Sequence, residues 1–223
     1  FKELLWKQEQ VAAEEVIMSP PQAAKRGLTS TITFPVGNIA PEGSVIKSTA
    51  IDASVINNEG VYYHKGAAKV YLSEKTAIYD IKHDKIKAGD ILVIIGVGPS
   101  GTGMEETYQV TSALKHLSYG KHVSLITDAR FSGVSTGACI GHVGPEALAG
   151  GPIGKLRTGD IVEIKIDCKQ LQGEVNFLGS STDDILPSRE EATAMLNNRS
   201  SHPDLMPDPA LPDDTHLWAM LQA

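Results

Sequence analysis

The chain has 223 residues, of which 41% are hydrophobic and 21% charged, an ordinary composition for a globular protein of one large or two small domains. Its formal net charge of −7 argues against a nucleic-acid partner, because neutralising phosphates requires a basic face. There are two cysteines and no CxxC pair, so no standard zinc or iron–sulfur ligand set is present. No apolar run is long enough to span a membrane. Unclustered cysteines are typical of reduced thiols, so we expect a cytoplasmic protein without a membrane partner.

Both ends of the sequence suggest an excerpt from a longer protein, because it starts with Phe1 and stops in "DDTHLWAMLQA" without a helix stop signal. Residues 1–27 are predicted to be a linker or docking segment, with a helix over residues 2–17 that ends at "SPP". We expect the main domain over residues 28–187. Residues 188–223 are predicted to form a helical and proline-rich C-terminal extension, which is truncated.

The main domain begins with strands and turns. "TSTITFPVGNIAPEGSVIKSTAI" alternates and is rich in β-branched residues, "AAKVYLS" is a further strand, and "EKTAIYDIKHDKI" is predicted to be a helix. The phrase "KAGDILVI" at 87–94 returns as "RTGDIVEI" at 157–164. Each is a Gly-Asp turn that leads into a strand. The first strand is apolar throughout, which predicts burial on both faces, and the second alternates, which predicts one exposed face.

Between these two phrases lies a strand–helix–strand unit, made of "ILVII", "ETYQVTSALKHLS" and "HVSLIT". The first strand leads into Gly96, Gly98 and Gly101, which spell G-x-G-x-x-G. A dinucleotide fingerprint also requires a helix directly after the loop and an acid about 20 residues later. Pro99 lies inside the turn, and no acid follows at that distance. A nucleotide-binding module therefore stays only as an alternative.

Two glutamates follow this glycine loop. Thr102 and Glu105 form an S/T-x-x-E pattern, which predicts a capping box at the start of the helix. Glu106 has two possible roles. It is either a solvated acid of the first helical turn or an oxygen ligand for Mg²⁺, which takes only one or two protein carboxylates.

A second cluster of polar residues follows the next strand, in "TDARFSG". Asp128, Arg130 and Ser132 lie just past a strand's C-terminal end, where open α/β sheets bind ligands. They form either a turn with an Asp–Arg pair or a serine whose hydroxyl a metal or positive field makes usable as a base. His142 is either an acid–base group or a hydrogen-bonded turn histidine, and Glu146 either serves the site or starts a helix.

Taken together, four stretches resemble the C-terminal domain of the dihydroxy-acid dehydratase and phosphogluconate dehydratase family. They are "VGNIAPEGSVIK", "GPSGTGMEETYQVTSAL", "LITDARFSGVSTGACIGHVGPEALAGGPIG" and "TGDIVEIKID", in order over about residues 34–170. The long tail resembles the sugar-acid branch, in particular the D-xylonate dehydratases. The resemblance implies an α/β, β-rich fold, namely a swivelling β/β/α domain with a mixed sheet or barrel core and flanking helices.

The resemblance also implies a hydro-lyase that converts a sugar acid, D-xylonate in this branch, to a 2-keto-3-deoxy acid. Its cofactors would be Mg²⁺ and an iron–sulfur cluster, with the cluster's cysteines supplied by an N-terminal domain that this sequence lacks. The implied partners are the sugar-acid substrate, the protein's own N-terminal domain and further copies in a homo-oligomer, and the isolated fragment is predicted to be inactive. The alternative within the family is a dihydroxy-acid dehydratase of branched-chain amino-acid biosynthesis.

The resemblance assigns roles to particular residues. The family pattern G-M-x-E falls on residues 103–106, which implies Glu106 as the Mg²⁺ ligand. The pattern G-R-F-S-G falls on residues 129–133, which implies Ser132 as the base.

Two positions depart from the family pattern. Ala129 stands where a glycine is usual, and the threonine usual after "SG" is not matched, so Ser135 is its expected substitute. Ser135, Arg130 and Gly133 are therefore predicted to bind substrate.

Overall fold

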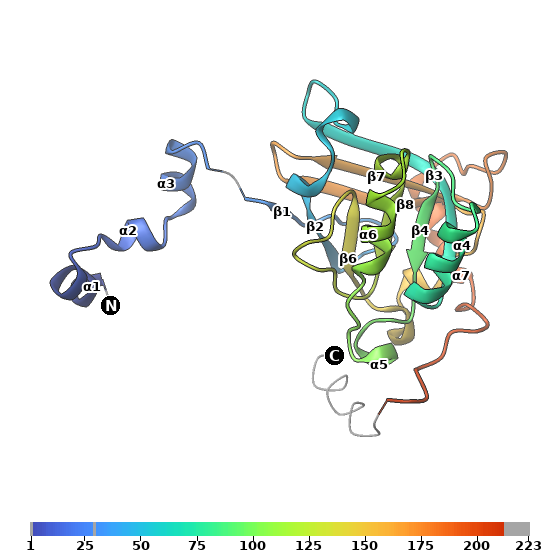
Figure 1. Cartoon of the computed structure of the whole chain (residues 1–223). Coiled ribbons are helices and arrows are strands. Elements are labelled where there is room, and N and C mark those ends of the chain that lie inside the picture. The colour runs from blue at the N-terminus through green and yellow to red at the C-terminus, as the bar shows by residue number, and fades with distance from the viewer. Residues whose placement is uncertain (1, 29, 212–223) are drawn as a thin grey trace. The chain divides into compact units, whose positions relative to one another are not determined.

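The structure, a computed structural model, describes residues 2–28 and 30–211 (Figure 1). The chain forms two compact units, Phe1–Thr31 and Ile32–Ala223. None of the described helices is long and apolar enough to cross a membrane.

The first unit consists of three short helices, α1 (Lys2–Glu9), α2 (Ala13–Val16) and α3 (Pro20–Lys25). The prediction of one helix over residues 2–17 is wrong. Gln10 has a φ of 55° and ends α1, and neither α1 nor α2 has a buried residue. Short helices depend on packing for their stability, so a segment without a buried face has little to keep a long helix continuous.

The second unit is built on one eight-stranded sheet in the order β1-β2-β6-β5-β4-β3-β7-β8. The central strands β3, β4, β5 and β6 are parallel to one another, and the other four pairs, β1–β2, β2–β6, β3–β7 and β7–β8, are antiparallel. The strands are β1 (Ile32–Thr33), β2 (Gly43–Lys47), β3 (Val61–Tyr71), β4 (Ile91–Ile94), β5 (Ser124–Thr127), β6 (Cys139–Gly144), β7 (Ile161–Asp167) and β8 (Gln172–Gly179).

The two edges of this sheet meet, which makes it a nearly closed barrel. Val36, just after β1, bridges Glu174 on β8. The Asn38 side chain then accepts a hydrogen bond from the Phe177 amide at 2.7 Å and donates one to the Phe177 carbonyl at 2.9 Å. The predicted fold class is confirmed, because the unit has a mixed sheet, a barrel core and flanking helices.

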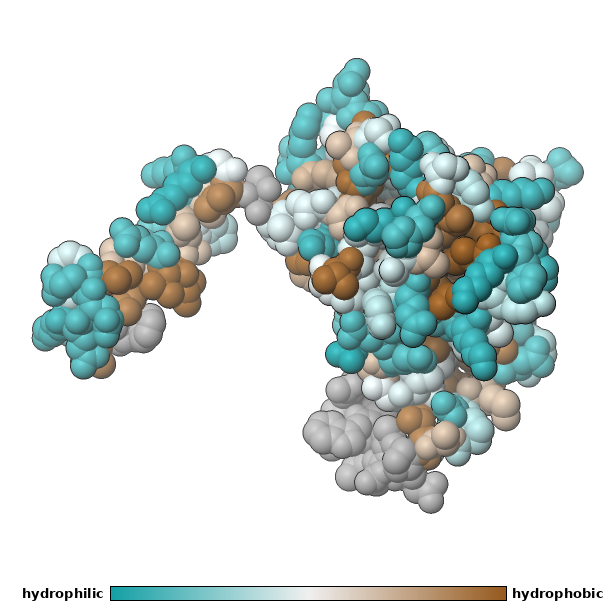
Figure 2. All heavy atoms as spheres, in the orientation of Figure 1, coloured by the Kyte–Doolittle hydropathy of each residue, from teal (hydrophilic) through white to brown (hydrophobic). Residues whose placement is uncertain are grey.

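The core has two parts, which lie on opposite faces of the sheet. Ile91 and Val93 of β4 point into the barrel interior, whereas Leu92 and Ile94 pack beneath the helices α4 (Glu74–Lys82) and α6 (Gln109–Lys115). Successive residues of a strand face opposite sides, so a strand covered on both faces must be apolar throughout, as the sequence predicted. Hydrophilic side chains cover most of the outer face that Figure 2 shows, and hydrophobic atoms show only in patches.

The strand–helix–strand unit is confirmed as β4, α6 and β5, and the alternating strand is confirmed as β7. The helix predicted at "EKTAIYDIKHDKI" is α4, which ends earlier, at Lys82. Two more helices complete the described fold, α5 (Pro99–Thr102) and α7 (Arg189–Asn198). Five 3₁₀ turns join the elements, at Ser48–Ala50, Ala53–Val55, Gly120–His122, Ala147–Ala149 and Pro152–Lys155.

Candidate active site

The predicted site residues lie in two loops that follow the neighbouring parallel strands β4 and β5. The first, residues 95–108, is the glycine loop, and the second, residues 128–138, is the serine loop. The two loops are joined at Glu106 and Arg130, which form a parallel bridge. The amide and the hydroxyl of Thr107 both donate to the Arg130 carbonyl, at 3.0 and 3.1 Å. The sheet therefore presents both loops at the edge where α/β proteins bind ligands.

Glu106 and Arg130 also form an ion pair, with 3.4 Å between Oε2 and Nη2. The prediction left open a pair between Asp128 and Arg130, and that alternative is wrong, because the arginine turns to the other loop. The side chains of Glu106 and Arg130 are 36% and 54% exposed. An ion pair this accessible contributes at most about 1 kcal/mol, so a ligand can replace either partner at little cost.

Asp128 instead organises the glycine loop from inside the protein. Its buried carboxylate accepts hydrogen bonds from the amides of Gly96 at 3.1 Å, Val97 at 3.2 Å and Ala147 at 3.0 Å. Burial raises the pKa of this carboxyl, and the three amide donors oppose that rise. Its role is to close the loop onto the strand ends.

Glu146 fills the next position of the same loop. Its carboxylate accepts from the Ser100 hydroxyl at 2.6 Å and from the Ser100 amide at 3.1 Å. A Cβ on Gly98 would collide with the Glu146 carboxylate, so the glycine makes room for it. The loop amides that would bind a pyrophosphate thus already donate to the protein's own carboxylates. A pyrophosphate also binds at the N-terminus of a helix, and the helix that follows Gly98, α5, has only four residues. These contacts speak against the nucleotide-binding alternative.

The predicted capping box forms only in part. The Glu105 amide donates to Thr102 Oγ1 at 3.0 Å, but α6 begins at Gln109. Neither glutamate therefore lies in the first turn of that helix, contrary to the prediction. The pairing of Thr107 with the serine loop keeps this segment extended, so Glu106 is presented by a bridge between two loops.

The serine loop gathers the other predicted residues into one turn. The Ser132 amide donates to Ser135 Oγ at 3.1 Å, and the Ser135 amide donates back to the Ser132 carbonyl at 3.0 Å. The Val134 amide lies 3.3 Å from Ser132 Oγ, toward which it donates, and Lys47 of β2 donates to the Gly133 carbonyl at 3.1 Å. Ser135 is buried and Ser132 is half-buried. The structure thus places Ser132 on a turn fixed from both sides.

His142 lies beside the start of this turn. Its amide donates to the Ala129 carbonyl at 2.8 Å, and its ring meets Phe131 edge-on with 6.0 Å between ring centroids. Burial and then the Arg130 charge lower the pKa of its imidazole. Its φ of 52° is unusual for a residue other than glycine, and no local sequence pattern predicts it. His142 lies in strand β6 rather than in a turn, and the two roles considered for its side chain stay predictions.

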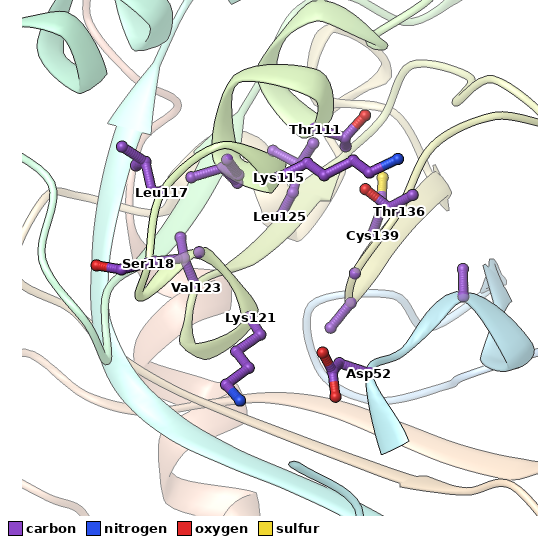
Figure 3. Close-up of a pocket in the computed structure, with 15 residues that line it drawn as sticks. Asp52, Thr111, Lys115, Leu117, Ser118, Lys121, Val123, Leu125, Thr136 and Cys139 are labelled. Carbon is purple, nitrogen blue, oxygen red and sulfur yellow. The ribbon is translucent and has the colours of Figure 1, made fainter. Parts of the chain in front are cut away.

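Two hollows flank these loops. One of about 440 Å³ is lined by Ser100, Asp128, His142 and Glu146, but not by Glu106 or Ser132. The other, of about 400 Å³, lies beneath α6, and Figure 3 shows Thr136 and Lys115 among the side chains that line it. Thr136 therefore serves a different hollow, which leaves Ser135 as the hydroxyl held against Ser132.

The described residues contain no group of three or more His, Cys, Asp or Glu side chains that could hold a metal ion. Glu106 offers a single accessible carboxylate, which fits Mg²⁺ as one ligand of several. The cysteines do not fit an iron–sulfur cluster. Cys139 packs beneath α6, where burial raises the pKa of its thiol to about 12, whereas Cys168 packs against the barrel interior.

Residues 15–204 match the family described as dihydroxy-acid/6-phosphogluconate dehydratase C-terminal, and the chain belongs to this family of domains. Among its relatives, D-xylonate dehydratase YjhG of Escherichia coli (strain K12) is 84% identical over 223 residues, 100% of this chain and 34% of that protein. D-xylonate dehydratase YagF of the same strain is 60% identical over the same shares.

A dihydroxy-acid dehydratase of Halothermothrix orenii is 46% identical over 141 residues, 63% of this chain and 24% of that protein. The chain thus spans about a third of the length of the D-xylonate dehydratases that it matches. The family resemblance found in the sequence is confirmed.

Proposed function

We propose that this chain is the C-terminal domain of a hydro-lyase that dehydrates a sugar acid, D-xylonate, to a 2-keto-3-deoxy acid. The observation that carries the proposal is identity of 84% and 60% over all 223 residues with two proteins named D-xylonate dehydratases. The dihydroxy-acid dehydratases of Halothermothrix orenii and Methanococcoides burtonii, by contrast, are 46% identical over 141 residues and 39% identical over 197 residues. The accessible Glu106, Arg130 and Ser132 at one edge of the sheet supply the polar groups that such a reaction needs.

Ser132 is the proposed base. As the alkoxide, its Oγ takes the proton from carbon 2 of the sugar acid, which starts the loss of water from carbons 2 and 3. A serine alkoxide is a strong base that needs stabilisation, and hydrogen-bond donors fixed in advance supply it. The Val134 amide, directed toward Oγ, is such a donor. Lys47 holds the turn at Gly133 and brings a positive charge next to it.

Glu106 is the proposed Mg²⁺ ligand of this chain. When bound, Mg²⁺ would hold the substrate's carboxylate and 2-hydroxyl and make the proton on carbon 2 more acidic. Binding of a cation at Glu106 would release Arg130 from its ion pair. The planar guanidinium could then bind the substrate carboxylate with two parallel hydrogen bonds. The ion pair between Glu106 and Arg130 would thus be replaced by two contacts with ligands, one of Glu106 with the cation and one of Arg130 with the substrate.

The remaining parts of the proposal concern what lies outside this chain. The further Mg²⁺ ligands and the iron–sulfur cluster would come from the protein's own N-terminal domain. The enzyme is proposed to be cytoplasmic and homo-oligomeric. The fragment alone would not dehydrate a sugar acid, because it would lack the further Mg²⁺ ligands and the cluster that the N-terminal domain is proposed to supply.

The test is an assay of the full-length enzyme, loaded with its cluster and Mg²⁺, for formation of a 2-keto acid. D-xylonate, D-gluconate and 2,3-dihydroxyisovalerate are compared at equal concentration. Preferred turnover of D-xylonate is expected. Turnover of only the branched dihydroxy acid would place the protein among the dihydroxy-acid dehydratases, and no turnover of any of the three would refute the proposed reaction.

A further inference from the structure

The chain that follows α7 runs back to the glycine loop. We call residues 199–211 the strap, which passes α5 in Figure 1. At its start Arg199 pairs with the buried Asp160, with 2.6 Å between Nη1 and Oδ2. The same guanidinium donates to Ser180 Oγ at 3.0 Å and lies 4.7 Å from the centre of the Phe177 ring. A desolvated charge held by an acid, a hydroxyl and an aromatic face fixes this end of the strap to the barrel.

The middle of the strap is bound to the barrel through its backbone. Arg157 donates to the Ser200 and Ser201 carbonyls at 2.9 and 3.0 Å. The His202 amide donates to the Gly154 carbonyl at 2.7 Å. These bonds leave little freedom for the strap before it reaches the glycine loop.

The far part of the strap touches the glycine loop at two points. Leu205 lies against Gly96, because a Cβ on Gly96 would be 2.6 Å from Leu205 Cδ1. The Asp208 amide donates to the Gly101 carbonyl at 2.8 Å. Pro207 and Pro209 flank Asp208 and have no N–H, so the Asp208 amide is the one donor of this tripeptide.

These two contacts bear on Glu106 through Thr102. Its hydroxyl donates to the Val97 carbonyl at 3.0 Å and accepts from the Glu105 amide at 3.0 Å. These bonds tie the segment from Val97 to Glu105, which directly precedes Glu106. We therefore expect a displacement at Gly96 or Gly101 to alter the position of the Glu106 carboxylate.

We propose that the strap positions the candidate active site, with Leu205 and the Asp208 amide holding the glycine loop so that Glu106 stays in place to bind a divalent cation. This inference rests on the proposed role of Glu106. The match to the family ends at residue 204, so both contacts come from outside the part that the family shares. Both D-xylonate dehydratases, however, align over the whole chain and include the strap. The part of the strap that carries these two contacts thus lies beyond the family match and is included in the alignment with both of these relatives.

The experiment compares Leu205→Ala with Met206→Ala in the full-length enzyme. Met206 is the matched control, because it is 69% exposed and adjacent in the chain. Hydrogen–deuterium exchange is followed in peptides from residues 96–107 and from β3, without Mg²⁺ and without substrate. Loss of the Leu205 side chain should speed exchange of the loop peptide about tenfold and leave β3 unchanged. Leu205→Met keeps a large apolar side chain at this position and should leave the exchange of the loop peptide as slow as in the wild type.

The second readout is the Mg²⁺ concentration that gives half-maximal dehydration. Leu205→Ala should raise it several-fold while excess Mg²⁺ restores kcat, whereas simple loss of folded enzyme would lower kcat at every Mg²⁺ concentration. Equal exchange in the two alanine variants, or faster exchange in β3 as well, would overturn the proposal. Faster loop exchange with an unchanged Mg²⁺ requirement would overturn the link to Glu106. Because exchange needs no substrate, failure of the proposed reaction would be seen separately.

A backbone variant covers the case in which Leu205→Ala does not fold. Asp208→Pro removes the amide that binds Gly101, and Asp208→Ala removes the side chain but keeps that amide. Only the proline variant should speed exchange in residues 96–107. The same rate in both variants would contradict a role for this hydrogen bond.

Discussion

Two serines at opposite ends of β5 show how differently one residue type can be used. Ser124 begins the strand and is fully buried, with its Oγ 2.5 Å from His64 Nδ1 and 2.8 Å from the Tyr62 hydroxyl. The Gly89 carbonyl, 3.1 Å from His64 Nε2, can only accept, so that nitrogen carries a proton and Nδ1 accepts from Ser124. Ser132, past the other end of the strand, has an amide near its hydroxyl and no histidine partner in the described hydrogen bonds.

By distance alone, Ser124 and His64 look more like a nucleophile and its base. No substrate can reach that hydroxyl, however, and Tyr62, Ser124, His64 and the Gly89 carbonyl satisfy one another in a single chain of hydrogen bonds. The network stabilises the sheet. Ser132 is reachable and lies on the loop that carries Arg130. Access and nearby charge therefore separate a candidate base from a structural hydroxyl better than proximity to a histidine does.

The largest expected effect is that of Ser132→Ala on the full-length enzyme. Loss of the base should lower kcat by about 10²–10⁴-fold, the usual contribution of general base catalysis. The absorption of the proposed iron–sulfur cluster should not change, since its cysteines would come from the N-terminal domain and not from this chain. Ser124→Ala is the control and should keep its activity per folded molecule. Full activity of the Ser132 variant would assign the base to another residue.

Glu106→Gln is expected to come next. An amide keeps the shape of the side chain but loses the charge that binds a cation and pairs with Arg130. The Mg²⁺ concentration for half-maximal activity should rise about 10–100-fold, as for the loss of a group that supports metal binding. Glu105→Gln alters an exposed neighbour and should leave the Mg²⁺ dependence as it is. Identical behaviour of the two variants would remove Glu106 from the metal site.

The buried serine should matter for stability. Ser124→Ala removes the shorter hydrogen bonds of His64 Nδ1 and the Tyr62 hydroxyl and leaves them only the contact of 3.3 Å with each other. The free energy of unfolding should fall by about 1 kcal/mol, the usual net contribution of a hydrogen bond. Urea unfolding of the 223-residue chain measures it, with the exposed Ser118→Ala as control. An unchanged midpoint would show that the network contributes nothing.

The smallest expected effect is on the pH dependence of stability. Burial lowers the pKa of His64, so the unfolded chain binds a proton at a higher pH than the native protein does. Stability should therefore fall as the pH drops below about 6.5, the ordinary histidine value, until it passes the native pKa. The pKa of His142 is also lowered, so this residue contributes to the loss of stability in the wild type and in a His64 variant alike. His64→Gln should thus show a shallower loss than the wild type in urea unfolding between pH 7.5 and 5, and equal slopes would contradict the assignment.

The sequence predicted best what one element determines alone. β4 is apolar because both its faces are buried, and β7 alternates because one face is not, so composition and periodicity were enough. The two loops carrying Glu106 and Ser132 were found for a similar reason, since each directly follows a predicted strand. Their roles came from the family resemblance, and they stay proposals.

Contacts between distant segments were beyond the sequence. Glu106 was placed at a helix start, but its partner Arg130 comes from the next loop and holds the segment extended. Asp128 was considered as a partner of Arg130. Its carboxylate oxygens instead accept hydrogen bonds from amides of the glycine loop and of Ala147. Such choices depend on which groups tertiary folding brings within reach, and local propensity does not encode them.

The closure of the sheet at Val36 and Asn38, where β1 is followed by contacts with β8, has a consequence for assembly. Exposed strand edges are templates onto which another chain can add a strand, and proteins commonly cover or close them. Here Val36 and Asn38 join the first edge to β8, so the described sheet offers no long unpaired strand for such pairing. Copies of this domain that associate would therefore have to do so through side-chain surfaces, and a substitution such as Asn38→Ala would be the change that opens a route to strand exchange.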